Sequence, residues 1–297
     1  MKSFQIKALS ILSVLAILFT SCGGGGQSQE KAASSEGDEF DEAKSQVISN
    51  INQVIKDLPP PSEVPYLLMA TGTDFDASLT NSLENLDSYS NPSSLAAVNL
   101  GIYITDIGYL TSYEKAQQTL DYVSACQKLS EDIGVASAMD MRLMSRFERN
   151  LNEKDSLKVL VDEVINRTSE RLDAIDRMNI AGLVLAGSYI EGLYVSTNLI
   201  ANFDDDLPAL VLEPLIKIII DQRPAVDDLL VVMEDLKGDA AIDEMTTNLN
   251  KIKTVYDTDL AEVSKAISEN TGNLMLTKDM LNSLTAAVSE IRTTYTK

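Results

Sequence analysis

The sequence predicts an all-α protein, a multi-helix bundle of about ten helices around a buried central helix. Apolar residues recur at spacings of three and four along most of the chain after residue 39, which is the period of an amphipathic helix. No run shows the period-two alternation of a half-buried strand. The segment 179–203, NIAGLVLAGSYIEGLYVSTNLIANF, is apolar on almost every side, which is typical of a helix enclosed by others.

The first helix is expected over residues 39–58, and three consecutive prolines after it end the apolar period. Residues 62–92 show no clear period. The next helix, 95–110, follows Ser93 and Ser94, either of which can cap it. Thr111 and Glu114 have the spacing of a capping box, which predicts that a separate helix begins there and ends at Gly134. Cys126 on this helix is expected to be a buried, inert thiol, because the chain has no histidine to activate it.

Residues 135–150 and 154–177 are expected to form two further helices, and the central helix follows them. Asp204, Asp205 and Asp206 interrupt the apolar pattern and favour the start of a helix over 207–222, although three aspartates could also bind a divalent cation. The remaining expected helices are 225–236, 240–256, 260–268 and 274–295.

The first 22 residues, MKSFQIKALSILSVLAILFTSC, have the pattern of an export signal. Lys2 and Lys7 form a positive start, and the apolar segment 8–19 is too short to remain as a membrane-spanning helix. Phe19-Thr20-Ser21-Cys22 resembles the lipobox of bacterial lipoproteins, in which the cysteine is acylated and becomes the N-terminus, although family members usually carry Leu where Phe19 stands. The resemblance implies a signal peptide over residues 1–21 and a lipidated, palmitate-bearing Cys22. The alternative is an ordinary secretory leader followed by a chance cysteine.

Residues 22–38 begin with four glycines after the cysteine, and their low hydrophobicity predicts a flexible tether to a helical domain over 39–297. By resemblance to lipoprotein sorting signals, Gly23 is not an inner-membrane retention signal, which favours the outer membrane. Some bacteria export lipoproteins to the cell surface through acidic residues directly after the cysteine. The first acid here is Glu30, so we expect a periplasm-facing domain, with surface exposure as the alternative.

The charge of the chain narrows the classes of partner. The net charge is −21, and removing Lys2 and Lys7 with the leader leaves 22 basic against 45 acidic residues, a net charge of −23. Such a surface repels phosphate backbones, so we expect no nucleic-acid partner and a membrane attachment through the N-terminal lipid. The chain has no histidine, the commonest general base and transition-metal ligand, so we expect no enzyme, no metal site and no cofactor.

Two of the expected helices carry polar residues along one face, flanked by apolar residues. In 95–110 and in 179–203, helical spacing aligns two stripes, and their members are Asn99, Tyr103 and Asp106, and Ser188, Glu191, Tyr194 and Asn198. Glycines such as Gly101 and Gly187 interrupt both helices and would permit close backbone approach. If the two helices pack together, the stripes could form a polar pocket in an apolar core.

These residues are therefore candidates for binding a small ligand or a cation, and Asp106 and Glu191 could serve as the carboxyl pair of a hydrolase. The alternatives are a satisfied hydrogen-bond network that fixes helix register, or two stripes that never meet. The absence of tryptophan argues against sugar stacking, and without histidine the Glu-x-x-His pattern of di-iron bundles cannot form.

The run NLGIYITDIGY at 99–109 resembles an Asn-Leu-Gly-x-Tyr-x-x-Asp-x-x-Tyr signature of helical lipoproteins from Bacteroidota. GSYIEGLY at 187–194 is similar to a second shared segment, and Gln222 with residues 227–229 to a third. The resemblance implies a helical envelope lipoprotein and brings no established catalytic residues. We therefore expect a lipid-anchored cell-envelope protein whose acidic helical domain binds an envelope protein or a small ligand, or serves a structural role. The alternative is a ligand- or cation-binding protein or hydrolase that uses Asp106 and Glu191.

Overall fold

The computed structural model describes residues 28–57, 63–70, 72–150, 153–174, 177–203, 209–269 and 277–297. The chain divides into two compact units, Met1–Ala43 and Lys44–Lys297. The described part of the first unit is helical. The predicted signal peptide, Cys22 and the predicted caps at 204–206 lie outside the described residues.

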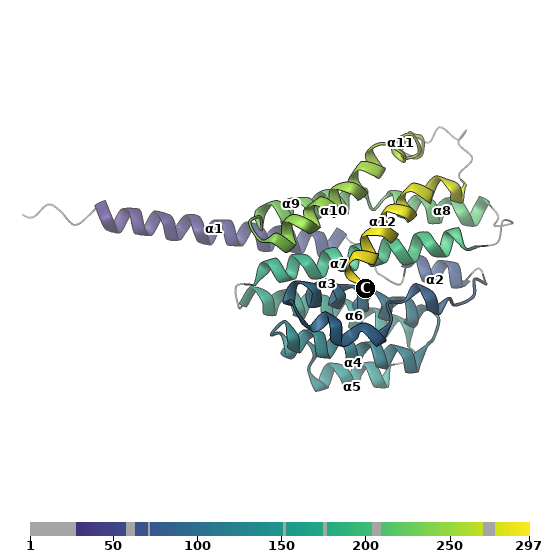
Figure 1. Ribbon diagram of the computed structural model, residues 1–297, viewed down its shortest axis with the longest axis horizontal. Helices are drawn as coiled ribbons and strands as arrows, with labels where there is room; N and C mark the ends of the chain where they lie inside the picture. Colours follow the sequence, from purple (N-terminus) through teal and green to yellow (C-terminus); the bar gives the residue numbers. More distant parts are fainter. Residues whose placement is uncertain are drawn as a thin grey trace, which may run out of the picture. The chain divides into compact units, whose positions relative to one another are not determined.

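Across its described ranges the chain is helical and has no strand, which confirms the all-α prediction (Figure 1). The α-helices are α1 (Ser28–Asp57), α2 (Glu63–Ala70), α3 (Ser93–Ser112), α4 (Ala116–Asp132), α5 (Met141–Arg149), α6 (Lys154–Ala174), α7 (Met178–Ala201), α8 (Ala209–Ile220), α9 (Arg223–Asp235), α10 (Ala240–Asp257), α11 (Ala261–Ser268) and α12 (Asn282–Tyr295). Four 3-10 helices complete the order: η1 (Ala77–Leu79), η2 (Leu83–Ser90), η3 (Ala136–Met139) and η4 (Lys278–Leu281).

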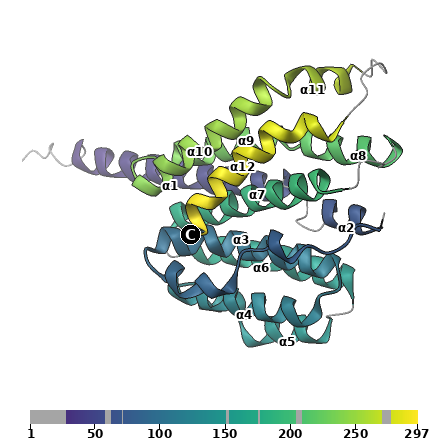
Figure 2. The same cartoon turned by 45° about the vertical axis from the view of Figure 1, so that its right-hand side comes forward.

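Helices α3 and α7 form the centre of the larger unit. Every residue of α3 from Ala96 to Ser112 is buried. In both ribbon views α7 lies between α3, α4, α5 and α6 on one side and α9, α10 and α12 on the other (Figure 2). Among the described helices, α7 alone is long and apolar enough to cross a membrane, but 89% of its apolar window is buried inside the protein. Helix α7 therefore corresponds to the buried central helix that the sequence predicts over residues 179–203.

Two glycines allow α3 and α7 to touch through their backbones. A Cβ atom added at Gly101 would lie 2.0 Å from the carbonyl oxygen of Val184, and one added at Gly187 would lie 2.2 Å from that of Val98. Real Cβ atoms do not approach other atoms so closely, so only glycine fits at either position. The predicted close approach of these two helices is therefore confirmed.

The predicted capping box at Thr111 and Glu114 is wrong, because α3 continues to Ser112. Glu114 adopts a left-handed conformation with φ of 57°, and the Lys115 and Glu114 amides donate to the carbonyls of Leu110 and Thr111. This pair of bonds is a Schellman motif, which ends a helix. Thr111 is buried within α3, so it belongs to the core.

Two other boundaries differ from the prediction. Helix α1 begins at Ser28 rather than at residue 39, because the preceding alanine, glutamate and lysine residues are good helix formers. The expected helix 135–150 is divided into η3 and α5, because the Asp140 carboxylate accepts a 2.9 Å hydrogen bond from the Leu143 amide and starts a new helix.

The segment between α2 and α3 packs against the helices. We call residues 76–91 the strap; it contains η1 and η2 and no longer element. Leu79, Asn81 and Tyr89 of the strap are buried. A few buried side chains therefore hold the strap in place. Because these side chains do not recur at a regular spacing, the sequence shows no apolar period there.

Candidate functional site: a buried polar cluster

The polar stripes of α3 and α7 meet in the core. The hydroxyl oxygens of Thr105 and Ser188 lie 2.8 Å apart, one on each helix. Asp106 directly follows Thr105, Glu191 lies about one turn after Ser188, and both carboxyl groups are on residues that are 0% exposed. The alternative in which the stripes never meet is therefore wrong, and the question becomes what the two carboxyl groups contact.

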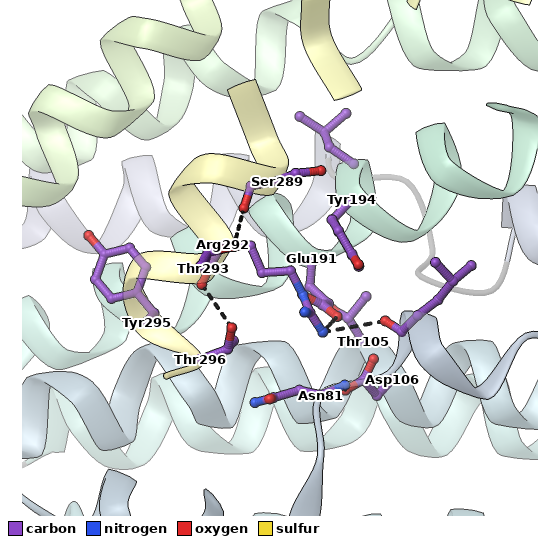
Figure 3. Close-up of polar contacts among 12 residues, drawn as sticks. Asn81, Thr105, Asp106, Glu191, Tyr194, Ser289, Arg292, Thr293, Tyr295 and Thr296 are labelled. Atoms are coloured by element: carbon purple, nitrogen blue, oxygen red, sulfur yellow. Dashed lines mark hydrogen bonds and ion pairs between the residues drawn. The ribbon is translucent and has the colours of Figure 1, made fainter. Parts of the chain in front are cut away.

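Glu191 is bound by an arginine from the last helix. Nε of Arg292 donates to Oε2 of Glu191 at 2.6 Å, and Nη2 donates to Oε1 at 2.9 Å. The guanidinium lies 4.1 Å from the centre of the Tyr194 ring, and its Nη2 also donates to the carbonyl oxygen of Leu79 at 3.3 Å. Figure 3 shows Arg292 extending from α12 toward Glu191, with Tyr194 beside it. Both Glu191 oxygens are therefore occupied by one cation, in the fork geometry that arginine prefers.

Asp106 is held differently on its two oxygens. Its Oδ2 accepts a 3.0 Å hydrogen bond from the Asn81 amide of the strap. Its Oδ1 is buried and receives no hydrogen bond from a donor group of the described residues. Burial raises the pKa of Asp106 well above its usual value, and the neighbouring Glu191 charge raises it further, while Arg292 and the Asn81 amide act in the opposite direction.

Core tyrosines bind the backbone of the strap. The hydroxyl groups of Tyr122 and Tyr103 donate to the carbonyl oxygens of Asn81 and Ser82 at 2.7 and 3.0 Å. The Tyr109 hydroxyl donates to the Asp76 carbonyl at 3.1 Å and accepts from the Asp76 amide at 2.9 Å. Burial raises the pKa of Tyr103, Tyr109 and Tyr122, so their hydroxyl groups keep the protons that they donate.

The side chain of Asn81 forms hydrogen bonds at both its oxygen and its nitrogen. Its Nδ2 donates to Oδ1 of Asn99 at 3.0 Å, and its Oδ1 accepts from the Tyr89 hydroxyl at 3.2 Å. Asn99 in turn donates through Nδ2 to the Tyr295 carbonyl at 3.0 Å, at the end of α12. The polar face of α3 therefore binds two other parts of the same chain, the strap and the C-terminal helix.

The seven candidate residues thus have different surroundings. Asp106, Glu191 and Tyr194 lie around Arg292, whereas Asn99 and Tyr103 bind the strap. Ser188 pairs with Thr105. Asn198 donates to the Tyr194 carbonyl of its own helix, a contact that involves no other element.

Sequence reasoning missed Arg292 and Asn81. A signal for Arg292 existed, because it lies in the apolar stripe that Val288, Ile291 and Tyr295 form at helical spacing, where a charged residue needs a buried partner. Asn81 had no such signal, because it lies in an irregular segment.

Two other features of the described ranges bear on a possible site. A groove of about 430 Å³ lies between α5 and α6, lined by Arg146, Asn150, Ser156, Val159 and Leu160. No group of three or more Cys, Asp or Glu residues there could hold a metal ion. Cys126 is fully buried, and burial raises the pKa of its thiol well above the ordinary value, with the Asp106 charge adding to the shift.

The comparison with known proteins identifies no family for this chain. No protein-family model matches the chain, and neither a curated protein nor a solved structure matches it.

Proposed function

We propose that this protein is a lipid-anchored cell-envelope protein, held at the outer membrane through an acylated Cys22, and that its acidic helical domain is a binding or structural module. The observation that supports the binding or structural role of the helical domain is the ion pair between Glu191 and Arg292. Both oxygens of a carboxylate that is 0% exposed are occupied by one guanidinium. Because each oxygen already accepts a hydrogen bond from an arginine of the same chain, this arrangement favours a role in joining α7 to α12 over binding a substrate.

The hydrolase alternative needs space between its two carboxyl groups for a substrate or a water molecule. Here the Asn81 amide donates to Asp106, and Arg292 lies on Glu191. Both partners belong to the same chain, which supports an architectural role for the pair. The partner surface must then lie on the exterior, where a net charge of −23 for the mature chain favours an envelope protein with a basic surface.

The anchor rests on the resemblance of residues 19–22 to a lipobox, and it can be tested through the two cysteines of the chain. The full-length protein, Cys22→Ala and Cys126→Ser would be expressed in a Gram-negative host fed an alkyne-bearing fatty acid. We expect label and membrane partition for the wild type and for Cys126→Ser, and neither for Cys22→Ala. Because Cys126 is buried, it is the matched control for loss of a cysteine. Label or full membrane partition in Cys22→Ala would overturn the proposed anchor.

The proposal that the cluster has an architectural role and binds no small molecule can be tested by thermal unfolding. The wild type and Asp106→Asn would be heated with divalent cations and with a panel of metabolites. We expect the same response from both proteins to every compound. A concentration-dependent rise of Tm in the wild type that Asp106→Asn abolishes would contradict the architectural role and favour ligand binding.

A further inference from the structure

Asp106, Glu191 and Arg292 lie together in the core with unequal charges. Two carboxyl groups face one guanidinium, so the cluster carries a net charge of −1 if both acids are ionised. Asp106 and Glu191 are each 0% exposed, and the Arg292 side chain is 11% exposed. An uncompensated charge at such depth costs several kcal/mol, and buried acids usually avoid that cost by taking up a proton.

The hydrogen bonds of Asp106 and Glu191 indicate which of the two acids holds the proton. Oδ2 of Asp106 is taken by the Asn81 amide, while Oδ1 has no donor among the described residues. The carboxyl groups of Glu191 and Asp106 are neighbours, and both the charge of Glu191 and a hydrogen bond to it would raise the pKa of Asp106. Two ionised carboxylates can only accept, so this contact is a hydrogen bond only if one of them is protonated. The bidentate bond from Arg292 stabilises the charge on Glu191, which leaves Asp106 as the acid that holds the proton.

From this geometry we infer that Asp106 stays protonated in the folded protein at neutral pH, donates from Oδ1 to Glu191, and thereby makes the cluster a neutral, pH-sensitive lock on the strap and α12. The lock joins four elements. Asp106 lies on α3 and Glu191 on α7, Arg292 comes from α12, and Asn81 belongs to the strap.

The groups around Asp106 support the same proton position. The titratable and charged side chains that interact with Asp106 come from α3, α4, α7 and α12, and they are Tyr103, Tyr109, Tyr122, Cys126, Glu191, Tyr194 and Arg292. Two strap residues, Tyr89 and Asp76, interact in turn with Tyr103 and Tyr109. The one cation among these named groups is Arg292, and it is already bound to Glu191. Ionised Asp106 would therefore face other acids without a cation of its own.

The direction of the pH effect follows from the raised pKa of Asp106. A carboxyl group whose pKa is higher in the folded than in the unfolded state contributes stability that is complete below its unfolded pKa. That contribution is lost as the pH rises through the folded pKa. Alkaline conditions should thus weaken the lock while the buried tyrosines, whose pKa values are also raised, remain neutral.

Infrared spectroscopy tests the proton directly in the folded full-length chain. We expect the carbonyl stretch of a protonated carboxylic acid at neutral pH in the wild type and its loss in Asp106→Asn. Asp76→Asn, which changes an acid of the strap that hydrogen-bonds Ser78 rather than the cluster, is the matched control and should keep the band. A wild type without the band, a band that survives in Asp106→Asn, or a band lost in Glu191→Gln while Asp106→Asn keeps it would overturn the inference.

Stability against pH provides a second readout. The urea midpoint of the wild type should fall as the pH rises from neutral into the alkaline range. Asp106→Asn presents an amide that can donate to Glu191 and accept from Asn81, so its midpoint should depend less on pH over that range. Equal pH dependence in the two proteins would contradict the lock.

Discussion

The cluster shows how individual residues constrain one another in an apolar core. Asp106, Glu191 and Arg292 would each be costly if buried alone, and each is acceptable because of the other two. The tyrosines act similarly, since Tyr122 and Tyr103 satisfy strap carbonyls that would otherwise be buried without partners. A single hydroxyl group therefore has a measurable effect.

Tyr122→Phe should destabilise the protein by about 1–3 kcal/mol, because it leaves the buried Asn81 carbonyl without its 2.7 Å hydrogen bond. The loss should be accompanied by faster amide hydrogen exchange in the strap. Tyr113→Phe, which removes a hydroxyl group without a hydrogen-bond partner among the described residues, is the control and should not destabilise the protein. Unchanged exchange in the strap of Tyr122→Phe would show that the hydroxyl does not hold it.

The sequence could identify only part of the cluster. Asp106 and Glu191 stood out because each interrupts a strongly apolar helix, and helical spacing aligned them with Tyr103 and Tyr194. The partner of Glu191 lies 101 positions later in the chain, and a local sequence pattern cannot predict a contact between residues so far apart. Arg292 was detectable only as a cation within an apolar stripe, and that observation names no partner.

At the scale of elements, the contact between α3 and α7 sets the positions of the polar residues. Gly101 and Gly187 bring the two backbones together, so Thr105 reaches Ser188 and Asp106 reaches Glu191. The glycines predicted this approach because they cost helix stability and need a packing reason. The helix ends were less predictable, since the Schellman turn after α3 depends on the left-handed Glu114 rather than on a glycine.

Gly101→Ala and Gly187→Ala should each destabilise the protein by about 1–3 kcal/mol or more, because the new methyl group would meet a backbone carbonyl that cannot move aside. Gly192→Ala is the matched control on α7. A Cβ there would meet nothing within 4 Å, so the substitution should gain up to about 1 kcal/mol from helix propensity. Urea unfolding measures all three, and similar values for Gly101→Ala and Gly192→Ala would contradict the backbone contact.

At the scale of the whole molecule, the acidic surface and the apolar centre are separate features. The net charge of −21 follows from composition alone, whereas the expectation of an all-α bundle follows from the spacing of apolar residues along the chain. The proposed lipid anchor also follows from local sequence, because a lipobox is a contiguous motif. The strap could not be predicted, because its position depends on hydrogen bonds to three other elements rather than on a period of its own.

Such a charge should make stability depend on salt. Like charges repel within the folded domain, and added salt screens this repulsion within about 10 Å at 0.1 M ionic strength. We expect Tm to rise as sodium chloride increases from low concentration to about 0.15 M, which brings the screening length to roughly 8 Å. Sucrose at matched osmolality controls for effects other than screening. A fall in Tm with salt would indicate that attractive surface ion pairs dominate instead.

The most direct test of the architectural role is a double-mutant cycle on Glu191 and Arg292. Urea unfolding would give the stability of the wild type, Glu191→Gln, Arg292→Met and the double variant. We predict that Arg292→Met costs about 3–5 kcal/mol, because it leaves a buried carboxylate without its cation. We also predict a coupling of about 2–3 kcal/mol between the two changes. Independent effects that add within about 0.5 kcal/mol, or a loss below about 1 kcal/mol for Arg292→Met, would contradict the claim that this buried pair holds the bundle together.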